Sequence, residues 1–183
     1  MSDRRAVLLE PHPDDAILFS CFNLLRYRPV VVTVLRPDTM TSRTYPGGSA
    51  DPHVRWAEHA QAMALVGATW EQWPFSDAAP DPDGIADRIS ALDCDVLIAP
   101  AVEEDGHPDH NLVGSLAQIL PCELIQYTTY TRGGGRTAAG RFVPYEFPWM
   151  AVKRRAMACY ESQAAHPATA PWFAAKDLRE WVA

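Results

Sequence analysis

Three apolar runs constrain the fold of this chain more than any other feature. They are "AVLLE" at 6–10, "PVVVTVLR" at 29–36 and "DVLIAP" at 95–100. Each is nearly unbroken in apolar character and rich in β-forming residues, which is typical of parallel strands buried on both faces. Helical patterns lie between or after them, at 14–27, 51–68, 81–93 and 151–165. This alternation predicts an α/β fold, a Rossmann-like three-layer sandwich whose mostly parallel central sheet carries helices on both faces.

The rest of the chain fits the same plan. Two further strands are expected at 123–130 and 141–147, joined by a glycine-rich loop at 131–140, and 37–50 reads as a surface loop. At 183 residues, without an internal repeat or a second composition boundary, the chain is expected to form one domain over 1–183.

Composition and charge narrow the range of partners. Hydrophobic residues make up 48% and charged residues 21%, as in ordinary globular proteins, and the net charge is −7. Because no basic cluster exceeds 153–155, direct nucleic-acid binding is not expected. The four cysteines are widely separated, and neither a signal peptide nor a membrane span is visible. We therefore expect a cytoplasmic protein with free thiols and no membrane partner; a homo-oligomer is left open.

Two similar loops carry the residues with chemical potential. His12, Asp14 and Asp15 stand in "PHPDDA" at 11–16, directly after the first apolar run, and "HPDH" at 107–110 follows the third. His-Pro-Asp thus occurs twice, each time where a predicted strand leads into a predicted helix. Because the carboxyl ends of parallel strands meet at one edge of the sheet, the two loops are expected to lie together.

Histidines and aspartates in such loops favour a metal site. Three ligands with an open fourth position are the design of catalytic zinc sites, where the ion lowers the pKa of a bound water to roughly 7. A neighbouring carboxylate then accepts the proton of that water. Either loop taken alone is equally well explained as a capped turn at a helix start. Only their combination predicts a metal centre.

These motifs resemble those of the PIG-L/LmbE-like family of zinc-dependent N-acetylglucosamine deacetylases. The family's His-Pro-Asp-Asp and His-Pro-Asp-His signatures correspond to 11–16 and 107–110. The stretch "RWAEHAQAMALVG" at 55–67 is similar to the family's Arg-x-x-Glu helix, and "KRRAMACYESQ" at 153–163 resembles its late Tyr-x-Ser-Gln stretch.

The resemblance implies a set of metal ligands and a base. His12, Asp15 and His110 correspond to the residues that bind zinc, with another divalent ion as an alternative. Asp14 corresponds to the general base that deprotonates the metal-bound water. The neighbouring dication explains the adjacent carboxylates, because it neutralises Asp15 and keeps Asp14 ionised.

The resemblance also implies three supporting residues. His107 corresponds to the protonated acid that stabilises the oxyanion and protonates the leaving amine. Asp109 is expected to orient His107, as carboxylates commonly orient catalytic imidazoles. Arg55 is similar to an arginine that contacts the substrate, although an exposed pair with Glu58 on a helix face explains it as well.

The chain departs from the family pattern at Ala16, where the family has an acidic residue, and at Pro11, where it has a small one. Among other residues, the histidines at 53, 59 and 166 are expected on the surface or on a helix face, and none is assigned a role. Trp73 and Trp149 are the tryptophans most suited to stacking on a sugar. Arg43, in the loop at 37–50, is expected to be solvated.

The function expected from the resemblance is zinc-dependent hydrolysis of the acetamido group of an N-acetylglucosamine-like conjugate, which gives acetate and a free amine. The substrate would be a small molecule or a glycan. Two alternatives remain open, a non-catalytic relative that binds sugar or metal and a metal-dependent phosphoesterase. The latter is disfavoured because no glycine-rich phosphate cradle is visible.

Overall fold

The computed structural model describes residues 4–37, 51–130, 140–167, 169–175 and 178–183. Most of the loops predicted at 37–50 and 131–140 lie outside these ranges, and so does Arg43.

A seven-stranded sheet forms the centre of the described part of the chain, in the order β3-β2-β1-β4-β5-β7-β6. The strands are β1 (Ala6–Glu10), β2 (Val30–Arg36), β3 (Trp70–Ser76), β4 (Val96–Pro100), β5 (Glu123–Tyr127), β6 (Arg141–Phe142) and β7 (Trp181–Val182). The first five strands in this order run parallel, and β7 pairs antiparallel with both of its neighbours. The predicted α/β class and mostly parallel sheet are confirmed.

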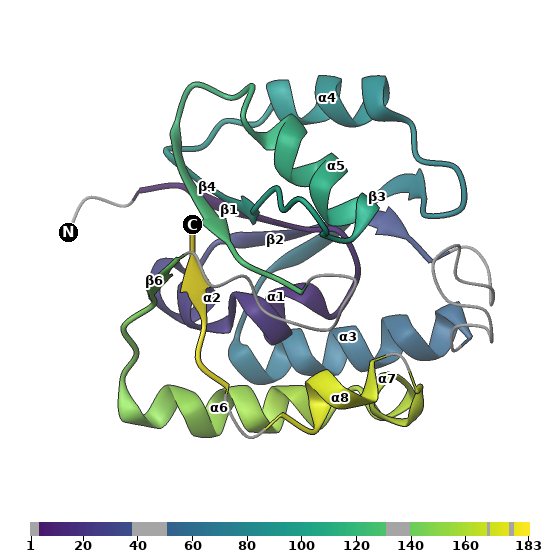
Figure 1. Ribbon diagram of the computed structural model, residues 1–183, viewed down its shortest axis with the longest axis vertical. Helices are drawn as coiled ribbons and strands as arrows, with labels where there is room; N and C mark the ends of the chain where they lie inside the picture. The colour runs from purple at the N-terminus through teal and green to yellow at the C-terminus, as the bar shows by residue number, and fades with distance from the viewer. Residues whose placement is uncertain (1–3, 38–50, 131–139, 168, 176–177) are drawn as a thin grey trace.

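Helices cover both faces of the sheet (Figure 1). The helices are α1 (Asp15–Phe19), α2 (Cys21–Tyr27), α3 (Pro52–Val66), α4 (Pro82–Ser90), α5 (Pro108–Ala117), α6 (Phe147–Met157), α7 (Glu161–Ala165) and α8 (Ala170–Phe173). Helices α4 and α5 lie on one face, and the others lie on the opposite one. A hydrophobic core lies on each face of the sheet, and neighbouring residues of β1 point to opposite faces. Leu8 belongs to the core that contains Ile17, and Leu9 belongs to the core that contains Ile85. The three-layer arrangement is confirmed.

The predicted helix at 14–27 is two helices, because Ser20 leaves the helical conformation at φ −138°. A buried ion pair holds the junction. Lys153 donates to the Leu18 carbonyl at 2.7 Å and to Glu180 at 2.7 Å, while Glu180 accepts from the Phe22 amide at 2.8 Å. These contacts satisfy backbone groups that the interrupted helix leaves unpaired. The break therefore depends on partners more than a hundred residues away, which no local pattern reveals.

Other boundaries also differ from expectation. Strand β3 was not predicted because Pro74 interrupts its sequence; the strand lies at the edge of the sheet, where a proline is tolerated. The strand expected at 141–147 ends at Phe142, and Phe147 already begins α6. The helix expected at 151–165 is interrupted between Met157 and Glu161.

No helix in the described ranges is both long and apolar enough to cross a membrane.

The buried ion pair yields a stability prediction. Replacing Lys153 with Met leaves the Glu180 carboxyl group, 2% exposed, without its partner. Because an unpaired buried charge is expensive, Lys153→Met is expected to lower the free energy of unfolding by about 3–5 kcal/mol in urea titrations. Arg4→Ala, which breaks the exposed pair with Glu123, is the matched control and should change little. Equal effects of the two variants would contradict this account.

Candidate metal centre

The two histidine loops meet at one edge of the sheet. Strand β1 ends at Glu10 and leads into the first loop, and the neighbouring strand β4 ends at Pro100 and leads into the second. The chain runs from β1 to β2 on one side, whereas β4 lies on the other side of β1. Such a reversal of strand order opens a crevice at the carboxyl ends of the strands, where α/β proteins bind ligands.

The predicted ligands His12, Asp15 and His110 converge in this place. Asp15 Oδ2 lies 3.5 Å from His12 Nδ1 and 3.2 Å from His110 Nε2. One ligand atom from each of the three residues lies within 4.8 Å of the others. His110 Nδ1 lies 3.0 Å from Thr129 Oγ1, which fixes the ring with Nε2 toward Asp15.

The donor set fits a zinc ion. His110 Nε2 is buried and faces Asp15 Oδ2 at 3.2 Å, so two potential ligand atoms lie side by side. Two imidazole nitrogens and one carboxylate oxygen are ligands that zinc accepts, and three protein ligands leave a fourth position for water or substrate. The geometry therefore accommodates the ion that the two loops predict.

The electrostatics of Asp15 and His12 also favour a cation between them. Burial raises the pKa of Asp15, but His110 and His12 outweigh it and hold that pKa well below its usual range. Burial lowers the pKa of His12, but hydrogen bonds to Asp109 and Asp15 outweigh it and raise that pKa to about 10. Without a metal, a proton on His12 thus balances the carboxylates. A divalent ion supplies the same positive charge.

The Asp109 carboxylate lies between two histidines and is closer to His12 than to His107, the residue it is predicted to orient. Its Oδ2 lies 3.0 Å from His12 Nε2 but 3.9 Å from His107 Nδ1. Asp109 is therefore placed to orient the ligand His12 through the ring nitrogen that faces away from Asp15, as carboxylates do for many metal-bound histidines. His12, His107 and Asp109 also form a second group of close ligand atoms.

His107 begins helix α5 and is buried near the metal ligands. Its Nδ1 accepts the Asp109 amide hydrogen at 3.2 Å, so the ring itself caps the helix. Burial, reinforced by the nearby His12 and His110, lowers the pKa of His107 to about 3. This shift favours the neutral ring, and the predicted role of His107 as a protonated acid stays a prediction.

The structure brings Arg55 and Asp14 together. Arg55 Nη2 lies 3.6 Å from Asp14 Oδ1, and both residues are buried. Burial raises the pKa of Asp14 even though Arg55 opposes the shift. The alternative prediction of an exposed pair between Arg55 and Glu58 is wrong. Glu58 is also buried, and it accepts hydrogen bonds from Ser162 N and Oγ at 2.7 and 2.6 Å.

A buried polar network beside the ligands was missed from the sequence. Glu10 accepts hydrogen bonds from the Ala16 amide at 3.0 Å and from Thr33 at 2.7 Å, and His59 Nε2 lies 3.3 Å from its carboxyl group. His59 lies on α3 but is fully buried, which excludes the surface position among those expected, and its Nδ1 lies 3.2 Å from the Tyr160 hydroxyl. The one available signal was an acidic residue at the end of an apolar strand. The family motif has an acidic residue at the position of Ala16. In this chain the carboxyl group near that position belongs to Glu10 instead.

Aromatic side chains near the ligands are not those expected. Tyr130 lies 5.3 Å from His110 between ring centroids and stacks on Trp172 at 5.1 Å. Trp73 is 2% exposed, and Arg88 lies over its ring. Trp149 lines a separate cavity.

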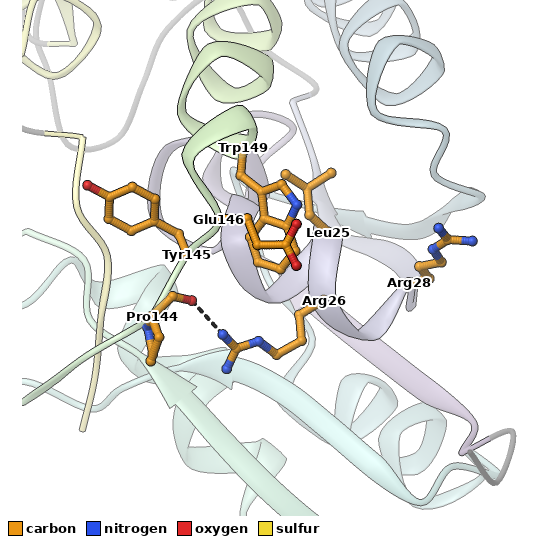
Figure 2. A pocket seen from close by; sticks show the side chains of 7 residues that line it. All are labelled: Leu25, Arg26, Arg28, Pro144, Tyr145, Glu146 and Trp149. Atoms are coloured by element: carbon orange, nitrogen blue, oxygen red, sulfur yellow. Dashed lines mark hydrogen bonds between the residues drawn. The ribbon is translucent and has the colours of Figure 1, made fainter.

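That cavity, of about 420 Å³, involves none of the predicted site residues (Figure 2). It is lined by Leu25, Arg26, Arg28, Pro144, Tyr145, Glu146 and Trp149. Arg26 donates to the Pro144 carbonyl at 2.5 Å and lies over the Trp149 ring. Because Arg28 stands just before β2 begins, this cavity flanks the amino-terminal side of the strands, opposite the metal centre.

Comparison with known proteins identifies relatives in structure only. No protein-family model and no curated protein sequence matches the chain. The zinc-inhibited form of teicoplanin deacetylase Orf2 superimposes with a TM-score of 0.68 at 16% identity, covering 87% of this chain and 84% of that one. N,N'-diacetylchitobiose deacetylase from Pyrococcus horikoshii gives 0.62 at 16%, covering 87% and 70%.

A third solved structure has a different activity. GalB, the 4-carboxy-2-hydroxymuconate hydratase from Pseudomonas putida KT2440, gives a TM-score of 0.64 at 12% identity, covering 98% of this chain and 95% of that one. The chain thus has the fold that these deacetylases and this hydratase share, in agreement with the resemblance seen in the sequence. At such identities the fold alone is shared, and the function must be argued from the site.

Removal of a ligand is expected to empty the metal centre. Wild-type protein reconstituted with zinc and dialysed should retain about one ion per chain, whereas His12→Ala and His110→Ala should retain little, because each deletes one of three ligands. Elemental mass spectrometry measures the content. His53→Ala, an exposed histidine on α3, is the control and should keep the ion. Equal zinc in all four proteins would show that the loops are not the binding site.

Proposed function

We propose that this protein is a zinc-dependent N-deacetylase that hydrolyses the acetamido group of an N-acetylglucosamine-like substrate. The observation that carries the proposal is the convergence of His12, Asp15 and His110, with a buried Asp14 adjacent to Asp15. The shared fold with two deacetylases supports it, and the description of one of them as a zinc-inhibited form supports the binding of zinc to a protein of this fold.

Amide hydrolysis needs a nucleophile, stabilisation of negative charge on the carbonyl oxygen and a proton for the leaving amine. When bound, zinc lowers the pKa of a water to about 7 and polarises the carbonyl group. Asp14 is assigned as the base, because burial raises its pKa toward the range in which a carboxylate accepts a proton efficiently. Arg55, 3.6 Å away, holds the Asp14 carboxylate in place.

His107 is assigned to the oxyanion and the leaving group. Its Nδ1 accepts the Asp109 amide hydrogen, so the neutral ring carries its own hydrogen on Nε2. A neutral imidazole in this tautomer donates a hydrogen bond to the developing oxyanion. The proton that Asp14 takes from water is the one that the leaving amine requires, and in this proposal His107 assists that transfer.

Asp109 and Arg55 act through their neighbours in this proposal. Asp109 orients His12 at 3.0 Å and thereby fixes one metal ligand. The substrate class is an acetamido sugar borne by a small molecule or a glycan, and one catalytic domain over 1–183 is sufficient for the reaction.

Replacement of the base separates catalysis from metal binding. Asp14→Asn is expected to lower kcat for acetate release from acetamido sugars by at least about 100-fold, because general-base catalysis contributes about 10²–10⁴. The zinc content should stay at the wild-type level, since Asp14 is not a ligand. Asp83→Asn, at an exposed position in the first turn of α4, is the matched control.

Other outcomes would assign another function. Full turnover by Asp14→Asn would refute the proposed mechanism. A wild-type protein that binds zinc but releases no acetate would favour a binding role, release of phosphate a phosphoesterase, and addition of water to an unsaturated acid the activity of the hydratase that shares the fold.

A further inference from the structure

Glu10 is a buried carboxyl group to which the proposed reaction gives no role. It is the last residue of β1, its exposed fraction is 0%, and the other residues of the strand are apolar. Burying a carboxyl group costs free energy unless hydrogen bonds compensate it. Its contacts therefore indicate what it does.

One of its hydrogen bonds reaches the metal-binding loop. Glu10 Oε2 accepts from the Ala16 amide at 3.0 Å, while Oε1 accepts from Thr33 at 2.7 Å. Ala16 follows Asp14 and Asp15 directly and belongs to the first turn of α1. The hydrogen bond thus ties the strand to the turn that carries both aspartates.

The same amide would ordinarily be capped by Asp14. The first amides of a helix lack partners within it, and an aspartate at the N-cap usually accepts one of them. Asp14 occupies the N-cap position of α1, yet its side chain makes no capping hydrogen bond and lies 3.6 Å from Arg55. Glu10 takes the capping place from outside the helix.

We propose that Glu10 is a positioning residue that caps helix α1 in place of Asp14. The Asp14 carboxylate is thereby left available for proton transfer, and Asp15 is held in a turn whose geometry suits the metal. Asp15 Oδ2 reinforces that turn by accepting from the His12 amide at 2.9 Å. The inference rests on the proposed function, because that function gives Asp14 and Asp15 their roles.

Two variants at position 10 test the capping bond. Glu10→Gln keeps an oxygen that accepts the Ala16 amide hydrogen, so its zinc affinity and kcat should stay near wild type. Glu10→Met has a similar length but no acceptor, and it should lose about 10- to 100-fold in zinc affinity or kcat, as is typical when the support of a metal ligand is removed. The KM should not change, because Glu10 does not contact substrate. Zinc affinity is measured by competition with a chelator, and kcat by acetate release.

Two controls distinguish positioning from stability. Ile85→Ala creates a cavity in the core on the opposite face of the sheet and should lower the unfolding midpoint without changing zinc affinity. Thr33→Val removes the other hydrogen bond of Glu10 and leaves the bond to Ala16, so zinc affinity should again be retained. A loss in either control as large as that of Glu10→Met would overturn the inference.

The remaining outcomes are equally decisive. Wild-type zinc affinity and kcat in Glu10→Met would refute the positioning role. If Glu10→Met does not fold, Glu10→Leu takes its place. If neither variant folds while Glu10→Gln does, the positioning role is refuted and Glu10 has a role in stability alone. A wild-type protein that binds zinc but releases no acetate would refute the proposed function, while the zinc affinities would still test how Glu10 supports the loop.

Discussion

Buried carboxyl groups of like charge at one edge of the sheet are the constraint that the rest of the site must satisfy. Asp14, Asp15 and Asp109 are each at most 5% exposed, and they lie among three histidines. Carboxylates gathered in this way repel one another and lose hydration unless positive charge is shared among them. The protein supplies part of it through Arg55 and His12, and a divalent ion would supply the rest. This electrostatic demand is the physical argument that the site could hold a metal ion.

The surrounding fold holds the charged groups in place at a cost in stability. The ion pair of Lys153 with Glu180 fixes the break between α1 and α2, and Glu58 joins α3 to α7 through Ser162. Glu10 and His59 form a further buried contact behind the aspartates. Sites that must hold ligands accurately depend on such supporting contacts, because a misplacement of about 1 Å costs catalysis heavily. The buried polar groups of this chain are concentrated where that accuracy is needed.

Shared fold and site chemistry make separate contributions to the functional argument. Deacetylases and a hydratase have this fold, so the arrangement of layers does not select a reaction. The argument for a particular reaction comes from the residues that follow the ends of β1 and β4. Two imidazoles and a carboxylate around an open position, with a second buried carboxylate adjacent, suit the activation of water for attack on an amide. If His107 is neutral, as its lowered pKa favours, stabilisation of the oxyanion in the proposed reaction would depend on hydrogen bonding and on the metal.

The sequence by itself determined the α/β class, the parallel strands at the centre and the two loops that carry His12, Asp15 and His110, because apolar periodicity and proline-containing motifs are local signals. Only the tertiary structure decided that Asp109 contacts His12, that Ser20 interrupts a helix and that Glu10 reaches Ala16. It also placed β3, which a proline interrupts, and the two-residue strand β7 in the sheet. These features depend on contacts between side chains that are distant in the sequence, or on the rotamer of a single side chain. Such contacts stabilise the protein only once the layers have packed, so no local pattern reveals them.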